Sequence, residues 1–197
     1  MTLVLASGSA ARKEMLSAAG LEFKSHPADL DEAEIIKDEK ARGASPADIA
    51  QSLACKKALH VALEYPGDLV IGADQILECE GRILSKASDV SEAFEKLQSL
   101  RGRTHQLISA VAVARGKDIL WQYAGKASLH MHDFDDDFLN AYTEKAGEAL
   151  FHSVGAYELE SIGAQLFDHI EGDYFTILGL PLLPLLSYLR DEQGMSL

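Results

Sequence analysis

One apolar run bounded by turn residues constrains the fold of this 197-residue chain more than any other feature. The run Leu69-Val70-Ile71-Gly72-Ala73 follows Pro66-Gly67 and contains no polar side chain. An uninterrupted apolar strand has to be covered on both faces, which is typical of the central strand of an α/β sheet. We therefore expect a strand that ends at Ala73, with Asp74 at or just past its end.

The rest of the chain alternates strand-like and helix-like segments without repeats or a long linker. This order predicts a mixed α/β sheet flanked by helices, folded as one domain over residues 1–197 or as two lobes around a cleft. Besides 69–73, the expected strands are 3–6, 21–26, 106–115, 119–132 and 165–169, with a hairpin around Glu80-Gly81-Arg82. The expected helices are 12–20, 90–100, 136–143, one from Ser45-Pro46 to Pro66-Gly67 with Ile49, Leu53, Ala54, Leu59 and Leu63 inward, and a last one from Pro181.

The charge and the cysteine content exclude several classes of protein. With 18 basic and 31 acidic side chains the formal net charge is −13, which disfavours a nucleic-acid polymer as partner. Cys55 and Cys79 are too few for a disulfide framework, and a reduced cytoplasmic location fits them. The start of the chain lacks a basic leader, and the apolar stretch 177–189 is interrupted by glycine and proline, so no membrane segment is expected.

A candidate phosphate site lies between the first predicted strand and the first predicted helix. Ser7-Gly8-Ser9 forms a turn there, and a helix that begins after such a turn presents free N–H groups and hydroxyls to an anion. The same pattern is also typical of a simple helix cap. Lys57, Lys86 and Arg103 recur at similar junctions and, together with the lone acid Asp74, favour phosphate chemistry.

Read together and in order, the motifs of this chain resemble those of the Maf family of nucleoside triphosphate pyrophosphatases. The resemblance covers almost the whole chain. It is carried by Leu5-Ala6-Ser7-Gly8-Ser9 with Arg12 and Glu14, the 54–58 segment with Lys57, Gly72-Ala73-Asp74-Gln75, Lys86, Gly102-Arg103-Thr104-His105, Gly155-Ala156-Tyr157, Gly172-Asp173-Tyr174 and Gly179-Leu180-Pro181.

The resemblance implies an elongated mixed sheet with a central cleft and the hydrolysis of a nucleoside triphosphate to the monophosphate and pyrophosphate. Asp74 would be the catalytic acid or base. The triphosphate would be bound by Ser9, Arg12, Lys57 and Lys86. A divalent cation, Mg²⁺ or Mn²⁺, would be held by Glu32 and Asp74. The family also implies that a homodimer can form.

Three positions of the resemblance bear on the nucleobase. Gln75 and Glu160 match the 7-methyl-GTP pyrophosphatase subgroup, whereas Ala11 matches neither that subgroup nor the dTTP and UTP hydrolases. A carboxylate can accept hydrogens from guanine N1 and the exocyclic amine, and it favours the positive charge that N7 methylation adds. We therefore expect 7-methyl-GTP as substrate.

Other functions and other roles for these residues stay open at the level of sequence. A dTTP or UTP pyrophosphatase of the same family is one alternative, and a nucleotide-binding regulator of cell division without turnover is another. A kinase is disfavoured because the chain has no Gly-x-x-x-x-Gly-Lys loop. Asp74 also fits a turn cap, Asp29–Glu32 a solvated turn, and Tyr157 and Phe175 either core positions or a platform for the base.

Overall fold

The computed structural model describes residues 2–194 and confirms the predicted α/β class. Within these residues, seven strands form one mixed sheet in the order β2-β1-β3-β5-β6-β7, and β4 pairs with β3. The chain divides into two compact units. Among the described residues, the first unit contains 2–75, 108–125 and 173–194. The second unit contains Ile76–Leu107 and Lys126–Gly172.

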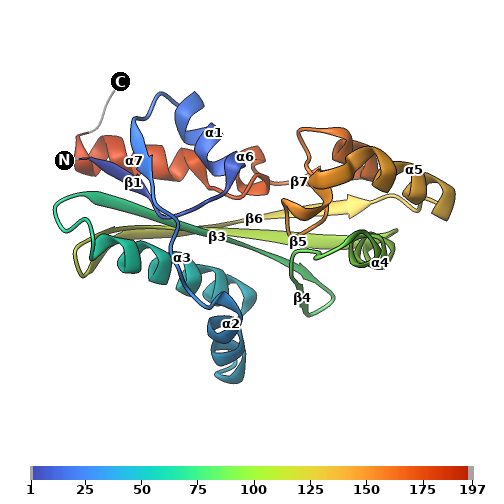
Figure 1. Ribbon diagram of the computed structural model, residues 1–197, viewed down its shortest axis with the longest axis horizontal. Helices are drawn as coiled ribbons and strands as arrows, with labels where there is room; N and C mark the ends of the chain where they lie inside the picture. Colours follow the sequence, from blue (N-terminus) through green and yellow to red (C-terminus); the bar gives the residue numbers. More distant parts are fainter. Residues whose placement is uncertain (1, 195–197) are drawn as a thin grey trace. The chain divides into compact units, whose positions relative to one another are not determined.

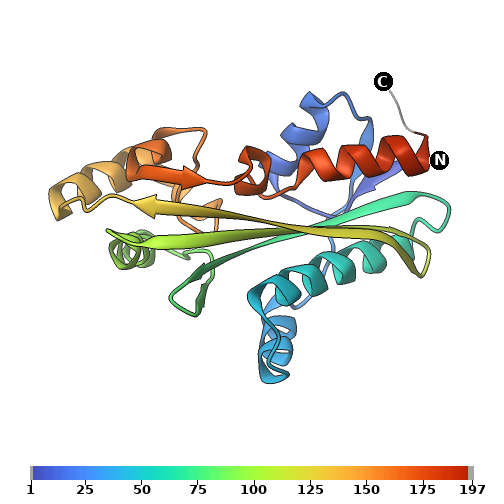
Figure 2. The same cartoon turned by 180° about the vertical axis from the view of Figure 1, so that it is seen from behind.

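In the first unit, helices cover both faces of a parallel-stranded core. β1 pairs in parallel with β2 and β3, α1 and α7 lie over one face of the sheet, and α3 lies over the other (Figures 1 and 2). Its elements are β1 (Leu3–Leu5), α1 (Ala10–Ala18), β2 (Phe23–Ser25), α2 (Glu32–Ala41), α3 (Pro46–Ala62), parts of β3 (Leu69–Cys79), β5 (Thr104–Arg115) and β6 (Asp118–Met131), α6 (Tyr174–Ile177) and α7 (Leu182–Gln193).

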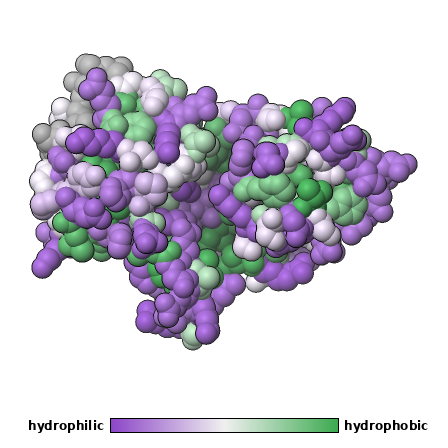
Figure 3. All heavy atoms as spheres, in the orientation of Figure 1, coloured by the Kyte–Doolittle hydropathy of each residue, from purple (hydrophilic) through white to green (hydrophobic). Residues whose placement is uncertain are grey.

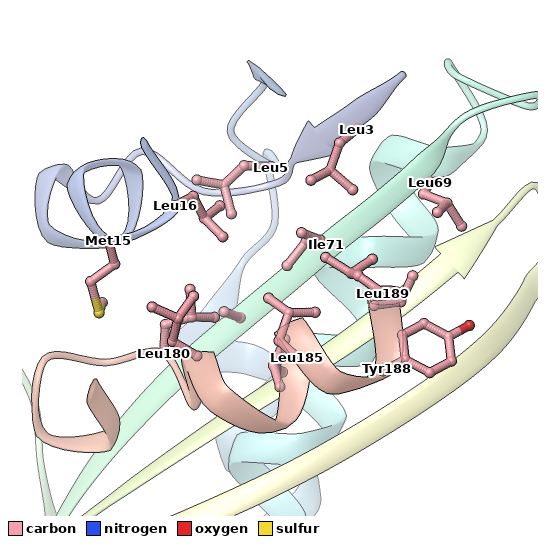
Figure 4. Close-up of a cluster of buried hydrophobic side chains, with 14 residues drawn as sticks. Leu3, Leu5, Met15, Leu16, Leu69, Ile71, Leu180, Leu185, Tyr188 and Leu189 are labelled. Atoms are coloured by element: carbon pink, nitrogen blue, oxygen red, sulfur yellow. The ribbon is translucent and has the colours of Figure 1, made fainter. Parts of the chain in front are cut away.

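A cluster of buried apolar side chains fills the space between the strands and the helices α1 and α7 (Figure 4). The strands contribute Leu5 and Ile71, the helices contribute Leu16 and Leu185, and all four side chains are fully buried. Burial of one such side chain stabilises the fold by about 1.5–3 kcal/mol. The cluster therefore fixes β3, which carries Asp74 and Gln75, against α1, which carries Ala11 and Arg12.

On the other face, α3 approaches β3 at a glycine. A Cβ atom on Gly72 would lie 2.1 Å from the carbonyl oxygen of Ala54 and 2.5 Å from the amide nitrogen of Ala58. Real Cβ atoms do not come so close to backbone atoms, so only glycine allows this packing. The close approach brings Lys57, which lies between the two alanines, next to strand β3.

The second unit is built from hairpins and short helices. β4 (Arg82–Leu84) pairs antiparallel with the end of β3, and β7 (Phe167–Glu171) pairs antiparallel with the end of β6. Asp89 and Asp135 cap the N-termini of α4 (Val90–Leu100) and α5 (Asp136–Ala146), which contact each other. Two 3₁₀ helices, η1 (Gly147–Phe151) and η2 (Ile162–Leu166), complete it.

Hydrophilic side chains predominate on the face seen in Figure 3, with smaller apolar patches among them. Of the helices formed by residues 2–194, none combines the length and the apolar character needed to cross a bilayer.

Most predicted elements are confirmed within a few residues, and three details are wrong. β3 continues to Cys79, so Asp74 lies inside the strand and not at its end, because Ile76, Leu77 and Cys79 are buried beyond it. The acidic stretch 29–32 leads into a helix that the sequence did not predict, α2, whose N-cap is Asp31. Leu63 lies outside α3 and is 61% exposed, because the helix ends one residue earlier.

Candidate active site

A lysine held between two carboxylates forms the centre of the candidate site in the first unit. The Nζ of Lys57 lies 2.6 Å from Oδ1 of Asp74 and 2.8 Å from Oε1 of Glu32. Lys57 and Asp74 are 8% and 7% exposed, whereas the Glu32 side chain is about half exposed at 47%. Three sequence-predicted residues thus meet at one point, supplied by α3, β3 and the first turn of α2.

Burial and charge act in opposite directions on Asp74. Burial raises the pKa of its carboxyl group above the ordinary value, and the nearby charges of Lys57 and Arg12 oppose that shift. A carboxylate with a raised pKa is a stronger base than an exposed aspartate. Asp74 is therefore suited to accept a proton or to orient a water molecule.

Arg12 is fixed by hydrogen bonds to three different parts of the chain. Its Nε donates to the carbonyl oxygen of Gly179 at 2.8 Å, and its Nη1 donates to the carbonyl oxygen of Ala73 at 2.9 Å and to Oγ of Ser7 at 3.1 Å. Burial lowers its pKa, and the charges of Asp74 and Glu32 oppose that shift. Among residues 2–194 the second terminal nitrogen, Nη2, has no hydrogen-bond partner, so it is the donor group left for a ligand.

The turn before α1 has the features of an anion site. Ser9 is the N-cap of α1, and its Oγ accepts from the amide of Arg12 at 3.4 Å, a long hydrogen bond. Ser7 Oγ accepts from the amide of Ser9 at 3.3 Å. Ala11 is the second residue of the helix and is partly exposed. An anion at this helix end would meet free N–H groups, the Ser9 hydroxyl and Arg12.

Gln75 follows Asp74 in β3, and its amide nitrogen is already engaged within the protein. Nε2 lies 2.9 Å from the carbonyl oxygen of Ile177, 3.0 Å from Oγ of Ser109 and 3.2 Å from the carbonyl oxygen of Thr176. Ser109 in turn donates to the same Thr176 carbonyl at 2.7 Å. These bonds connect β3 to α6, so any influence of Gln75 on the nucleobase runs through its oxygen or through the placing of α6.

The remaining predicted site residues lie in the second unit. Lys86 is exposed in the loop between β4 and α4, and Glu160 is exposed in a turn before η2. The first unit therefore brings together five predicted residues: Arg12, Glu32, Lys57, Asp74 and Gln75. Ser9 and Ala11 belong to the same unit and lie next to Arg12 in the chain. That Lys86 and Glu160 act on the same ligand stays a prediction.

The donor set fits a small divalent cation. Asp74 and Glu32 both contact Nζ of Lys57, so their carboxylates lie near each other, and Mg²⁺ is typically held by one or two carboxylates together with substrate phosphates. Among the residues that the structure describes, no group of three or more histidine, cysteine, aspartate or glutamate side chains forms a complete metal cage. That Asp74 and Glu32 hold a divalent cation stays a prediction.

Two residues support the site through contacts with Arg12 that the sequence did not predict, although Ser7 belongs to the predicted phosphate turn. Ser7 and Gly179 both accept from Arg12, and Gly179 has a φ of +98°, which favours glycine. Both residues belong to motifs that carry the resemblance to the Maf family, and for Gly179 this was the only indication in the sequence. A separate apolar hollow of about 410 Å³ contains none of the predicted site residues; it is lined by Leu30, Lys56, Leu59, His60, Leu63, Gly116 and Lys117.

Comparison with known proteins shows matches over the whole described chain. The family model of the Maf-like proteins matches residues 2–192. A nucleoside triphosphate pyrophosphatase of Granulibacter bethesdensis is 48% identical over 196 residues, 100% of each chain. A 7-methyl-GTP pyrophosphatase of Rhizobium meliloti is 47% identical over 189 residues, 96% of this chain and 95% of that protein.

Similarity to solved structures is weaker. A HAM1 protein from Coxiella burnetii matches with a TM-score of 0.42 and 16% identity over 83% of this chain and 97% of its own, a level that adds nothing to the assignment. The full-length family match and the identity to the two relatives are decisive. This chain belongs to the Maf family.

Proposed function

We propose that this protein hydrolyses a nucleoside triphosphate to the monophosphate and pyrophosphate, and that the preferred base is 7-methylguanine. The names of the relatives from Granulibacter bethesdensis and Rhizobium meliloti support this activity. One observation supports the proposal most strongly. Nζ of Lys57 forms ion pairs with the carboxylates of Asp74 and Glu32, at 2.6 and 2.8 Å, and the guanidinium of Arg12 is fixed nearby. Such a site combines cations for phosphates with a base for water.

The reaction needs a nucleophile, charge neutralisation and a leaving group. The oxygen of water forms a bond to the α-phosphorus, and the bond from that phosphorus to the bridging oxygen breaks. Its electron pair leaves with pyrophosphate, and the attacking water loses a proton. Asp74 accepts that proton or orients the water molecule, while Lys57 and Arg12 offset the charge of the polyphosphate. Ser9 and the first turn of α1 bind a phosphate oxygen through N–H and O–H donors.

Asp74 and Glu32 would hold the divalent cation, Mg²⁺ or Mn²⁺, together with phosphate oxygens. When bound, the cation supplies positive charge that reduces repulsion between the polyphosphate and an incoming water. If the cation engaged both carboxylates, Lys57 would be able to donate to a phosphate oxygen.

The choice of base rests on Glu160, with Lys86 as a further cation for the polyphosphate. Glu160 is exposed, so its carboxylate is open to a ligand. Ala11 and Gln75 are the other positions expected to influence the base. A neutral glutamine at position 160 would lose the electrostatic preference for the positively charged 7-methylguanine ring.

Initial rates over 7-methyl-GTP, GTP, UTP, CTP and dTTP test the proposal, with pyrophosphate and orthophosphate measured separately. We expect pyrophosphate release with the highest kcat/KM for 7-methyl-GTP, and a dependence on Mg²⁺ or Mn²⁺. A preference for UTP or dTTP would contradict the choice of base. Orthophosphate as the product would contradict the reaction itself.

The variant Asp74→Asn separates an enzyme from a nucleotide-binding regulator. Asparagine keeps the size of the side chain but cannot accept the proton, so we expect kcat to fall by about a thousandfold while nucleotide binding persists. Asp191→Asn is the matched control, because Asp191 is exposed on α7 and pairs with Arg190. An unchanged rate in Asp74→Asn would remove Asp74 from the chemistry.

A further inference from the structure

The second unit contains a buried polar pair that the proposed reaction does not use. Nε2 of His105, the second residue of strand β5, lies 2.6 Å from the hydroxyl oxygen of Tyr157. The two residues are only 1% and 4% exposed. Phe167 packs edge-on against Tyr157, with 4.8 Å between the ring centroids. This hydrogen bond joins the sheet to the loop that carries Glu160.

The pair costs more than an apolar pair of the same size. His105 stays neutral near pH 7, because burial lowers its pKa to about 4. If Tyr157 donates to Nε2, the proton on Nδ1 of His105 is buried without an acceptor among residues 2–194. In the other tautomer, Nδ1 and the Tyr157 hydroxyl hydrogen both lack a partner. Stability alone would therefore favour two apolar side chains here.

The backbone around Tyr157 is shaped to hold its ring in one place. A Cβ on Gly155 would lie 2.3 Å from Cε1 of the Tyr157 ring, so the ring folds back over a position that has to be glycine. Ser153 Oγ accepts from the Tyr157 amide at 3.1 Å and donates to the Tyr157 carbonyl oxygen at 2.6 Å. Ala156 has a φ of +58°, a conformation that is costly for a residue with a Cβ. The tyrosine is thus held at both its backbone and its hydroxyl.

Glu160 follows Tyr157 in a tight turn. The amide of Ser161 donates to the carbonyl oxygen of Glu158 at 3.2 Å, which makes Glu160 one of the two central residues of a β-turn. A Cβ on Gly163 would lie 2.4 Å from the same Glu158 oxygen, so the chain after the turn packs directly on its start. Because the turn begins next to Tyr157, the place of that side chain determines where the Glu160 backbone lies.

We propose that Tyr157 and His105 are positioning residues for base selection, and that their hydrogen bond sets the location of the turn that presents Glu160. The inference rests on the proposed function, in which Glu160 meets the base. The pair touches neither substrate nor cation in this account. It acts by reducing the number of positions that the Glu160 carboxylate can adopt, so a preorganised acceptor meets 7-methylguanine.

The first test is the ratio of kcat/KM for 7-methyl-GTP to that for GTP, in Tyr157→Phe and in Glu160→Gln. Tyr157→Phe keeps the ring and removes the hydroxyl. We expect it to lower the ratio by about tenfold, mainly through a higher KM for 7-methyl-GTP, with kcat nearly unchanged. Tyr188→Phe is the matched control, since Tyr188 is also largely buried and its hydroxyl accepts from Gln193 in the first unit. We expect that control to keep the wild-type ratio.

A second variant separates positioning from a purely structural role. In His105→Leu combined with Tyr157→Phe, no buried polar atom of the pair is left unpaired. We expect Tm to return to the wild-type value or above it, while the substrate ratio stays low. If the ratio recovers together with Tm, the pair is structural and the proposal is wrong.

Ser153→Ala covers the case in which Tyr157→Phe does not fold. It removes only the clamp on the Tyr157 backbone, and we expect about a threefold lower ratio; an unchanged ratio would overturn the proposal. A wild-type protein that releases no pyrophosphate would refute the proposed function, and this inference with it. If Glu160→Gln lowers the ratio and Tyr157→Phe does not, the proposed function stands and only the positioning role fails.

Discussion

The two units bury polar groups in opposite ways. In the first unit, Lys57 and Asp74 are opposite charges held 2.6 Å apart, and Arg12 lies near enough to influence the carboxyl. In the second unit, His105 and Tyr157 form a neutral pair with one polar atom unpaired. A charged cluster is suited to a charged ligand and to proton transfer, whereas a neutral pair as deeply buried as this one is suited to fixing geometry. The comparison separates residues that would handle phosphate from residues that would shape the base site.

The difference also predicts how each region responds to substitution. A buried ion costs several kcal/mol when its partner is removed, because its charge is then uncompensated. Removal of one partner of a neutral pair costs only the desolvation of one polar atom, about 1–3 kcal/mol. The charged cluster is therefore the more sensitive region, and substitutions there give the largest expected effects.

Lys57→Met should have the largest effect. It leaves Asp74 and Glu32 without the ammonium that lies between them, so we expect a loss of about 3–5 kcal/mol in the free energy of unfolding. Nucleotide hydrolysis should fall at least a hundredfold as well. The neighbouring Lys56→Met is the control: Lys56 pairs with Glu39 at 3.6 Å and its side chain is 43% exposed, so less than about 1 kcal/mol is expected. Urea denaturation measures both, and equal effects would refute the distinction.

Gly72→Ala should be next in size. The added Cβ would meet the backbone of Ala54 and Ala58 at 2.1 and 2.5 Å, so α3 has to move away from β3. We expect a loss of about 3 kcal/mol and a marked fall in activity, since Lys57 moves with the helix. Gly67→Ala is the matched control, because no atom lies within 4 Å of a Cβ there. A Gly72→Ala protein with wild-type stability and activity would contradict the close packing proposed to place Lys57.

The neutral pair should be visible in the pH dependence of stability. The pKa of His105 falls from 6.5 to about 4 on folding, because of burial first and of nearby His130 second; Tyr157 and Phe167 complete its surroundings. Below pH 6.5 the unfolded chain takes up a proton on this group and the folded chain does not. The free energy of unfolding should therefore decrease by about 3 kcal/mol at most as the pH falls from 6.5 to 4.

His105→Leu isolates that contribution. The difference in unfolding free energy between wild type and variant should change with pH in this window and be constant above it. A difference that does not vary between pH 6.5 and 4 would show that His105 titrates normally in the folded protein.

The sequence predicted the class of fold and most elements because apolar periodicity and caps are local signals. Val90–Leu100 was predicted at its observed bounds, and Ser45 forms the expected cap of α3. The extent of β3 was not predictable from its own residues. Asp74 and Gln75 look like a strand end, and they are accommodated inside the strand by Lys57 and by the acceptors near α6, which come from distant segments.

In the candidate site, too, residues in recognisable motifs were predicted and contacts between distant segments were not. Arg12, Lys57 and Asp74 were predicted because they belong to the family motifs, and the structure brings them together. The helix that carries Glu32 was missed, since its apolar stripe is weak and it buries no residue fully. The roles of Gly72, Ser7 and the pair formed by His105 and Tyr157 depend on contacts across the fold, which no single segment reveals.

The position of bond cleavage tests the central claim most directly. Hydrolysis of 7-methyl-GTP in water enriched in the heavy oxygen isotope labels whichever product receives the water oxygen. Attack at the α-phosphorus, with Asp74 and Lys57 at that atom, predicts the label in the nucleoside monophosphate and none in pyrophosphate. Label in pyrophosphate, or release of labelled orthophosphate, would show that water attacks elsewhere and would contradict the account.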